Sequence, residues 1–297
     1  MKKSFLTLAA TVALLGTAGV ATPVLAQSSA ITNALLSQKA GQLDKALESI
    51  NQAVASDKTK DKDKPKAWFT RGEIYYQLVD PSTQALFGKY AKGMQPGEPL
   101  QKAAESYKKA LELDGPTGEY GKQVPGRLQN LYGLAFNAGV QNYNAASKLE
   151  GAEKAAEYDK AIASYKLASE MNPQDTTAVL YGAYAQSAKQ DFAGAKVSYN
   201  KLLAMDVYKT KPAPVGVYTQ LLQIARQEKN DAEAQKVVQQ ALAAYPNNKT
   251  FLIEDLNLSM SGGNSAGALD KINKTIAADP GNANLYAVRA GIYDAQK

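Results

Sequence analysis

One helix-length phrase returns several times along this 297-residue chain. The segment GQLDKALESINQAVASD, residues 41–57, reappears in altered form from Lys189, Glu228 and Gly263. Aligning these segments with two further copies gives six equivalent alanines, spaced 57, 58, 34, 39 and 34 residues apart: Ala46, Ala103, Ala161, Ala195, Ala234 and Ala268. A single amphipathic copy cannot bury its own apolar face, so we expect neighbouring copies to stack against one another.

The spacing inside each copy is helical. Ala103, Tyr107 and Ala110 fall three or four residues apart and therefore share one face of a helix. Alanine lets two helices approach closely, while the larger residue one turn later fills the space beside it. Glycine or proline then ends the helix, at Gly115, Pro173, Pro246 and Pro280. The pattern predicts an all-α fold, an α-solenoid of tandem helix-turn-helix repeats.

Further residues of the sequence resemble the consensus of the tetratricopeptide repeat (TPR) family. In PKAWFTRGEIYYQL, Trp68, Gly72 and Tyr75 stand where that family has its first-helix Trp, Gly and Tyr. LYAVRAGIYD repeats the arrangement near the end of the chain. The first helices of the later repeats, such as YTQLLQIARQ and FLIEDLNLSM, lack the Trp and Gly. The resemblance implies a solenoid over residues 27–297, with about six repeats and a final helix.

Three segments interrupt the repeats. Residues 79–99 carry three prolines and three glycines, which rule out one continuous helix. A second insertion is expected at residues 147–154, after an extended helix from about Gly126 to Ala146. The charged linker DKTKDKDKPK, Asp57–Lys66, lacks the glycine and final Glu of a calcium loop, so we interpret it as a solvated turn.

The first 26 residues have the three parts of a secretory signal. Lys2 and Lys3 are followed by the apolar run Leu6–Val20 and by small residues at the expected cleavage site after Ala26. The protein is therefore predicted to be exported, periplasmic or secreted. It is not predicted to be a lipoprotein, because the chain has no cysteine. No later stretch approaches the ~20 apolar residues of a membrane span.

Composition excludes several chemistries. The chain has no histidine and no cysteine, so the commonest general base and the usual zinc ligands are missing. Phosphate-binding loops and nucleophile elbows are absent as well, and no catalytic residue, metal or cofactor is predicted. Without the leader, 32 basic and 28 acidic residues leave a net charge of +4, too mild to indicate nucleic acid. Paired carboxylates could support glycoside hydrolysis in principle, but the acids here lie on polar helix faces among lysines, as do Glu105, Glu112, Glu153 and Glu157.

Tyrosine is frequent, with 17 residues. An aromatic-lined groove is one interpretation of this count. Periodic aromatics more often mark a buried face, however, and six of them occupy repeat-core positions. These six are predicted to pack in the core: Trp68, Tyr75, Tyr107, Tyr165, Tyr199 and Tyr293.

By resemblance to TPR proteins, the first helices line a concave groove that holds a peptide or a segment of another protein. The register places the following residues there: Lys66, Phe69, Glu73, Tyr76, Tyr181, Tyr184, Gln220, Gln223, Arg226 and Asn257. They mix aromatic, amide and charged groups, as protein contacts often do, although a merely polar groove would look similar. The Lys/Asn/Arg clamp by which some relatives hold a free carboxylate is not reproduced.

The insertion at 79–99 offers a second candidate surface, because long loops in repeat proteins often lie on the working face. Phe87 and Tyr90 are its aromatic residues, and the alternative is that they pack onto their own solenoid.

Three functions remain open from the sequence. The first is a non-enzymatic scaffold of the bacterial cell envelope that binds other envelope proteins or peptide segments. The second is a glycan- or small-ligand-binding module, which requires Phe69, Tyr76, Tyr181 and Tyr184 to form a flat platform. The third, a hydrolase, lacks the motifs that its reaction class needs. The sequence does not indicate the identity of the partner or the oligomeric state, since the residues that recur in every repeat are expected to pack in the core rather than to bind a partner.

Overall fold

The structure, a computed structural model, describes residues 23–261 and 265–294, with side chains from Ala30 onward except those of residues 265 and 266. The charged and apolar parts of the predicted leader lie outside these ranges. Within them, fifteen α-helices and three short 3-10 helices make up the regular structure, and there is no strand. The predicted class, an all-α solenoid of helix-turn-helix pairs, is confirmed.

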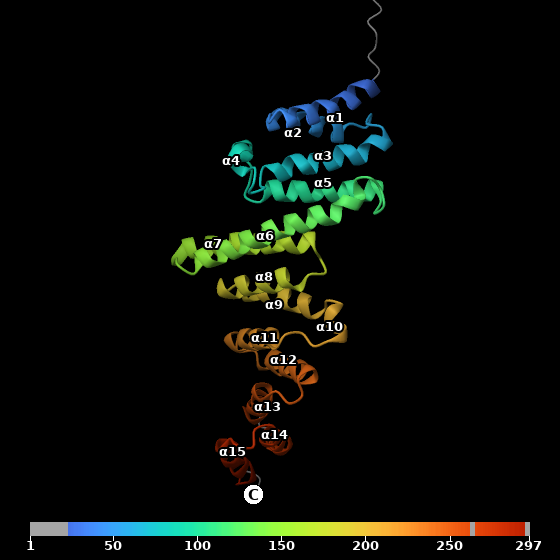
Figure 1. The fold of residues 1–297 in the computed structure, drawn as a ribbon. Coiled ribbons are helices and arrows are strands. Elements are labelled where there is room, and N and C mark those ends of the chain that lie inside the picture. The colour runs from blue at the N-terminus through green and yellow to red at the C-terminus, as the bar shows by residue number, and fades with distance from the viewer. Residues whose placement is uncertain (1–22, 262–264, 295–297) are drawn as a thin grey trace, which may run out of the picture. The chain divides into compact units, whose positions relative to one another are not determined.

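The chain forms two compact units, Met1–Arg127 and Leu128–Lys297, and each is described by itself. In the first unit two helix hairpins pack side by side (Figure 1). They consist of α1 (Pro23–Lys39) with α2 (Leu43–Ala55), and α3 (Lys64–Gln77) with α5 (Glu98–Asp114). The short elements of this region are η1 (Asp61–Asp63), α4 (Gln84–Phe87), η2 (Gly88–Ala91) and η3 (Gly121–Gln123).

The second unit continues the same architecture. The boundary falls within α6 (Val124–Ala146), which agrees with the extended helix expected there and packs on α7 (Gly151–Met171). The hairpins that follow are α8 (Thr176–Ala188) with α9 (Phe192–Leu203), α11 (Val215–Gln227) with α12 (Asp231–Ala244), and α13 (Lys249–Ser261) with α14 (Ser265–Ala278). A single turn, α10 (Val207–Thr210), precedes α11, and α15 (Ala283–Asp294) packs on α14.

The repeated alanine is the contact point of these hairpins. All six equivalent alanines are at most 1 % exposed. Glycine extends the same logic, because the Tyr107 ring lies so close to Gly72 that a Cβ there would be 2.6 Å from it. Gly139 meets the Tyr165 ring at the same distance. Small residues therefore admit a large aromatic ring from the second helix of the pair.

Polar side chains start several helices of the second unit. Asp175 accepts a hydrogen bond from the Thr177 amide at 2.6 Å, and Asp191 accepts one from the Gly194 amide at 3.0 Å. Such caps satisfy amides that lack a partner inside the helix. The first turns of α8 and α9 are fixed in this way, and with them the turn that separates the two helices.

The insertion at 79–99 folds against its own unit. The Tyr90 hydroxyl donates to the Gly41 carbonyl at 3.2 Å, at the turn between α1 and α2. Phe87 is half-buried against the same glycine, whose φ of +72° favours a residue without a side chain. Packing onto the solenoid was the alternative given above for these two aromatics. Residues 98 and 99 belong to α5, so the turn-rich segment is two residues shorter than expected.

Most predicted core aromatics are buried, but two are not. Tyr75, Tyr107, Tyr165 and Tyr199 are at most 4 % exposed, which confirms their assignment. Trp68 is only half-buried. The prediction is wrong for Tyr293, which is 52 % exposed, because no helix in the described ranges follows α15 to cover that face.

Candidate functional site: an uncharged groove in the second unit

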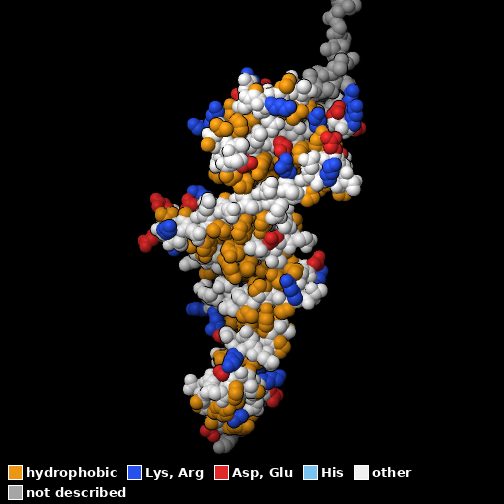
Figure 2. Space-filling view, viewed as in Figure 1, with side chains coloured by type: hydrophobic (Ala, Val, Ile, Leu, Met, Phe, Trp, Pro, Cys, Tyr) orange, Lys and Arg blue, Asp and Glu red, His pale blue; other side chains and the backbone are white. Residues whose placement is uncertain are grey.

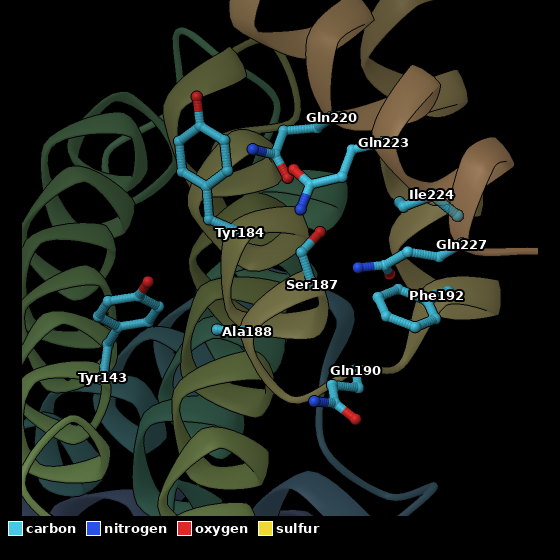
Figure 3. Close-up of a pocket in the computed structure, with 10 residues that line it drawn as sticks. All are labelled: Tyr143, Tyr184, Ser187, Ala188, Gln190, Phe192, Gln220, Gln223, Ile224 and Gln227. Atoms are coloured by element: carbon cyan, nitrogen blue, oxygen red, sulfur yellow. The ribbon is translucent and has the colours of Figure 1, made fainter. Parts of the chain in front are cut away.

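A groove with a volume of about 360 Å³ opens between α6, α8 and α11 (Figure 3). The turn between α8 and α9 closes one side of it. These helices are the first members of three successive pairs, so the groove lies where the resemblance placed it. Its lining residues are Tyr143, Tyr184, Ser187, Ala188, Gln190, Phe192, Gln220, Gln223, Ile224 and Gln227.

Helix α11 contributes a stripe of glutamines. Gln220, Gln223 and Gln227 are spaced three and four residues apart and lie on one face of the helix. The opposite face, with Leu221, Leu222 and Ala225 among its residues, is buried in the core and fixes the direction of the stripe. Within the described part of the chain, the side-chain amides of these glutamines and of Gln190 make no hydrogen bond to protein atoms. Each amide offers two donors and an acceptor oxygen to a ligand.

Helices α6 and α8 contribute the aromatic side. Tyr184 projects from α8 and Tyr143 from α6 (Figure 3). Ring contacts hold Tyr184 between Tyr181 and Tyr199, with centroid distances of 6.0 and 6.2 Å. Phe136 lies 5.4 Å from Tyr181 and extends the surface along α6. Figure 2 shows hydrophobic side chains gathered in this region of α6 to α8 on the viewed face.

The tyrosines of the groove remain neutral at physiological pH. Burial, followed by electrostatic interaction with Tyr181, raises the pKa of Tyr184 above its usual value. Burial likewise raises the pKa of Tyr143, with a smaller contribution from Tyr158. Both groups therefore present phenolic hydroxyls that donate or accept hydrogen bonds.

Three charged residues that flank the groove in the sequence form ion pairs with residues elsewhere in the second unit. Lys189 contacts Asp159 at 2.5 Å, and Glu228 contacts Lys196 at 2.7 Å. Arg226 forms an ion pair with Glu254 of α13. None of the residues that line the groove carries a formal charge. A ligand in the groove consequently meets dipoles and aromatic rings rather than ions.

The structure brings together part of the predicted groove in the second unit. Tyr184, Gln220 and Gln223 line one space, with Tyr181 beside it at 42 % exposure. Asn257 and Arg226 are exposed but do not line the groove. Sequence analysis missed Tyr143, Gln190, Phe192 and Gln227. Of these, only Gln227 had a signal, because it continues the helical spacing of Gln220 and Gln223.

The predicted residues of the first unit lie in a different setting. Glu73 accepts a hydrogen bond from Tyr107 at 2.7 Å and pairs with Arg127 at 2.7 Å. Phe69 departs from the expected exposure, since it is 8 % exposed and packs on Tyr107 and Tyr120. Lys66 is half-buried on α3, and so is Tyr76, whose pKa is raised by burial and then by Asp80. The roles of these residues and of Phe87 and Tyr90 in partner binding stay predictions.

No cluster of three or more acidic side chains within the described ranges is arranged to hold a metal ion. Among the helices that are described, none has both the length and the apolar character needed to cross a bilayer.

Comparison with known proteins identifies the repeats. Two tetratricopeptide repeat family models match the chain, one at residues 31–99 and the other at residues 215–248. The first match runs from α1 through α2 and α3 to the first two residues of α5, and the second covers α11 and α12. The helix hairpins with small residues at their crossings define a helical repeat protein. These two segments of the chain belong to the tetratricopeptide repeat family.

Several solved structures are similar in fold. PilW, described as a widely conserved type IV pilus biogenesis factor, is 19 % identical, with 88 % of this chain and 97 % of PilW covered and a TM-score of 0.35. YrrB, described as a TPR protein with an unusual peptide-binding site, is 18 % identical over 65 % of this chain and 84 % of YrrB, with a TM-score of 0.38. The C-terminal part of a TPR protein from Cytophaga hutchinsonii is 16 % identical, covering 86 % and 98 % of the two chains, with a TM-score of 0.41. No curated protein matches by sequence.

Proposed function

We propose that the protein is a non-enzymatic scaffold of the bacterial cell envelope that holds segments of partner proteins in the groove between α6, α8 and α11. The coarser statement follows from the family: a TPR fold is a protein-interaction module. The observation that carries the proposal is a groove lined by aromatic rings and by glutamines whose side-chain amides make no hydrogen bond to the described protein. Such groups suit a polypeptide better than a reacting substrate, because no carboxylate, lysine or histidine lines the groove to act as a general base or to activate the Ser187 hydroxyl.

The envelope location rests on the leader at residues 1–26. Cleavage after Ala26 would remove the first four residues of α1 (Pro23–Lys39) and keep the part of that helix that carries the buried residues Ala30, Ile31 and Ala34. N-terminal sequencing of protein recovered from a bacterial envelope fraction is expected to start at Gln27. Recovery of unprocessed chain in the cytosol would contradict this part of the proposal and leave the binding part untouched.

Protein binding ranks ahead of glycan binding on ring geometry. Sugar rings stack on aromatic faces, and a platform for several sugars needs rings of similar orientation. Tyr181 and Tyr184 are inclined at 63° to each other, and Phe136 and Tyr181 at 69°. These edge contacts suit side chains that enter between rings rather than a flat sugar surface.

The test is affinity capture from envelope extract. The processed protein is compared with a Tyr181→Ala/Tyr184→Ala variant, and Tyr293→Ala serves as the control because Tyr293 is an exposed tyrosine on another helix. Arg226 is left intact, since its removal would leave Glu254 without its ion pair. Proteins retained by wild type and the control but lost from the double variant support the proposal. If no captured protein depends on the two tyrosines at unchanged melting temperature, the groove is not the binding site.

A further inference from the structure

We infer that the groove selects an extended, uncharged segment of its partner, with main-chain groups held by the glutamines and one apolar side chain inserted between Tyr184 and Phe192. This inference rests on the proposed function and names the chemistry of the ligand for that site. We call the surface formed by Tyr143, Tyr184, Gln190, Gln220, Gln223 and Gln227 the Tyr/Gln groove.

The length of the glutamine stripe matches a short extended segment. Gln220 and Gln227 are seven residues apart, which at ~1.5 Å per residue places their backbones about 10 Å apart along α11. An extended chain advances ~3.3 Å per residue, so the stripe runs beside about three residues of a ligand. Each of those residues has one N–H and one C=O, and an amide side chain can both donate to and accept from them.

The floor of the Tyr/Gln groove provides the apolar contact. Phe192 and Ile224 line one side of it, and Tyr184 and Ala188 of α8 line the other (Figure 3). A volume of about 360 Å³ falls at the lower end of the range for ligand pockets, which is room for one side chain of a segment rather than for a folded element. Proline or an aromatic residue would fill this space and stack on the tyrosine.

The pairing of nearby charges argues against a charged ligand. The Lys189–Asp159 and Lys196–Glu228 pairs and the Arg226–Glu254 pair neutralise the ions that flank the Tyr/Gln groove. Asp191 is engaged with the amide of Gly194. A carboxylate or ammonium group that entered would lose water without gaining an opposite charge, which is unfavourable. An uncharged segment loses only hydrogen bonds that the glutamines replace.

The experiment is selection from a phage-displayed library of random 12-residue peptides on the processed full-length protein. Enriched peptides are synthesised with acetylated N-termini and amidated C-termini, and their Kd values are measured by fluorescence anisotropy at low and high salt. Depletion of Asp, Glu, Lys and Arg from the shared core of the selected peptides is expected. Salt should change Kd by less than about twofold, because few ionic contacts form.

Matched glutamine variants locate the binding. Gln223→Ala in the Tyr/Gln groove is expected to raise Kd about tenfold through lost main-chain contacts. Gln240→Ala, an exposed glutamine on α12, is expected to leave Kd unchanged. Peptides that depend on Gln223 but carry charged cores would overturn the inference while the proposed function stands. Absence of any Gln223-dependent peptide, or Gln223-dependent binding of soluble peptidoglycan fragments instead, would overturn both.

Discussion

Two glycines on α6, Gly133 and Gly139, differ in how much space is available for a side chain. A Cβ at Gly139 would lie 2.6 Å from the ring of Tyr165, which is 1 % exposed. A Cβ at Gly133 would have no described atom within 4 Å apart from its chain neighbours and the backbone of its own helix. Gly139→Ala should therefore lower the free energy of unfolding by about 1–3 kcal/mol through overpacking. Gly133→Ala should raise it by about 0.5–1 kcal/mol, since alanine restricts the unfolded helix segment.

Denaturant unfolding followed by circular dichroism measures both effects. The two variants differ by the same single methyl group on the same helix, so each controls for the other. Equal stabilities would mean that the Tyr165 ring moves aside at no cost and that the close approach is not required.

Buried tyrosines also make stability depend on pH. Burial, with a smaller contribution from Tyr181, raises the pKa of Tyr165 to about 12, and burial raises that of Tyr199 to about 12. An unfolded tyrosine titrates near pH 10. The folded state holds these protons more tightly, so the stabilisation is fully present below pH ~10 and is lost as the pH rises toward 12.

The melting temperature is accordingly expected to be insensitive to these groups between pH 7 and 9 and to fall between pH 10 and 12. Tyrosinate absorbance and circular dichroism recorded together provide the measurement. Complete ionisation of all tyrosines before any loss of helix signal would refute the expectation.

At the scale of helices, the spacing of apolar residues predicted which face of each helix is buried. It did not predict which helices contact one another around the groove. The three- and four-residue spacing inside each copy indicated the helices because it depends only on local helix geometry, and the recurrence of the six alanines indicated that these helices form repeated hairpins. Tyr143 was missed, since its place in the groove depends on how far the long α6 extends past α8. Tyr293 was misassigned for a related reason, because its consensus position requires a covering helix. Gln220 and Gln223 line the groove, and the register pointed to them because it carries over from one hairpin to the next; their role in binding stays a prediction.

A charged residue inside the C-terminal hairpins was equally hidden from sequence analysis. Asp255 on α13 is 7 % exposed and accepts hydrogen bonds from Gln235 and Gln239 of α12 and from Lys271 of α14. Three helices are thus joined through one carboxylate. Lys271→Met should lower the free energy of unfolding by about 2–4 kcal/mol, somewhat below the usual cost of breaking a buried pair because the lysine is a quarter exposed.

Calorimetry of two companion variants tests the cause. Lys209→Met removes an exposed lysine that pairs with Asp206 and is expected to change nothing measurable. Asp255→Leu/Lys271→Met removes both charges and should recover much of the loss. A double variant as unstable as Lys271→Met would assign the effect to packing rather than to an unpaired carboxylate.

For the whole molecule, repetition separates the residues that build the core from those available for binding. The equivalent alanines recur because the two helices of every hairpin must approach equally closely. Gln220, Gln223 and Tyr184 line the groove, and the packing of the hairpins does not require the same residues at the equivalent positions of other repeats. Stability in such an array is approximately a sum of repeat and nearest-neighbour terms. A ligand site can therefore differ from repeat to repeat without changing the fold.

The same additivity predicts how the chain unfolds. Trp68, the single tryptophan, lies in the first compact unit, while circular dichroism reports on all helices. Gly139→Ala weakens packing in the second unit, so the circular dichroism midpoint in urea should fall while the Trp68 fluorescence midpoint moves little. Gly72→Ala, which brings a Cβ within 2.6 Å of Tyr107 in the first unit, should shift the Trp68 midpoint first. Coincident midpoints in wild type and both variants would instead establish one cooperative transition across the whole chain, and with it couplings between hairpins that exceed the stability of any single one.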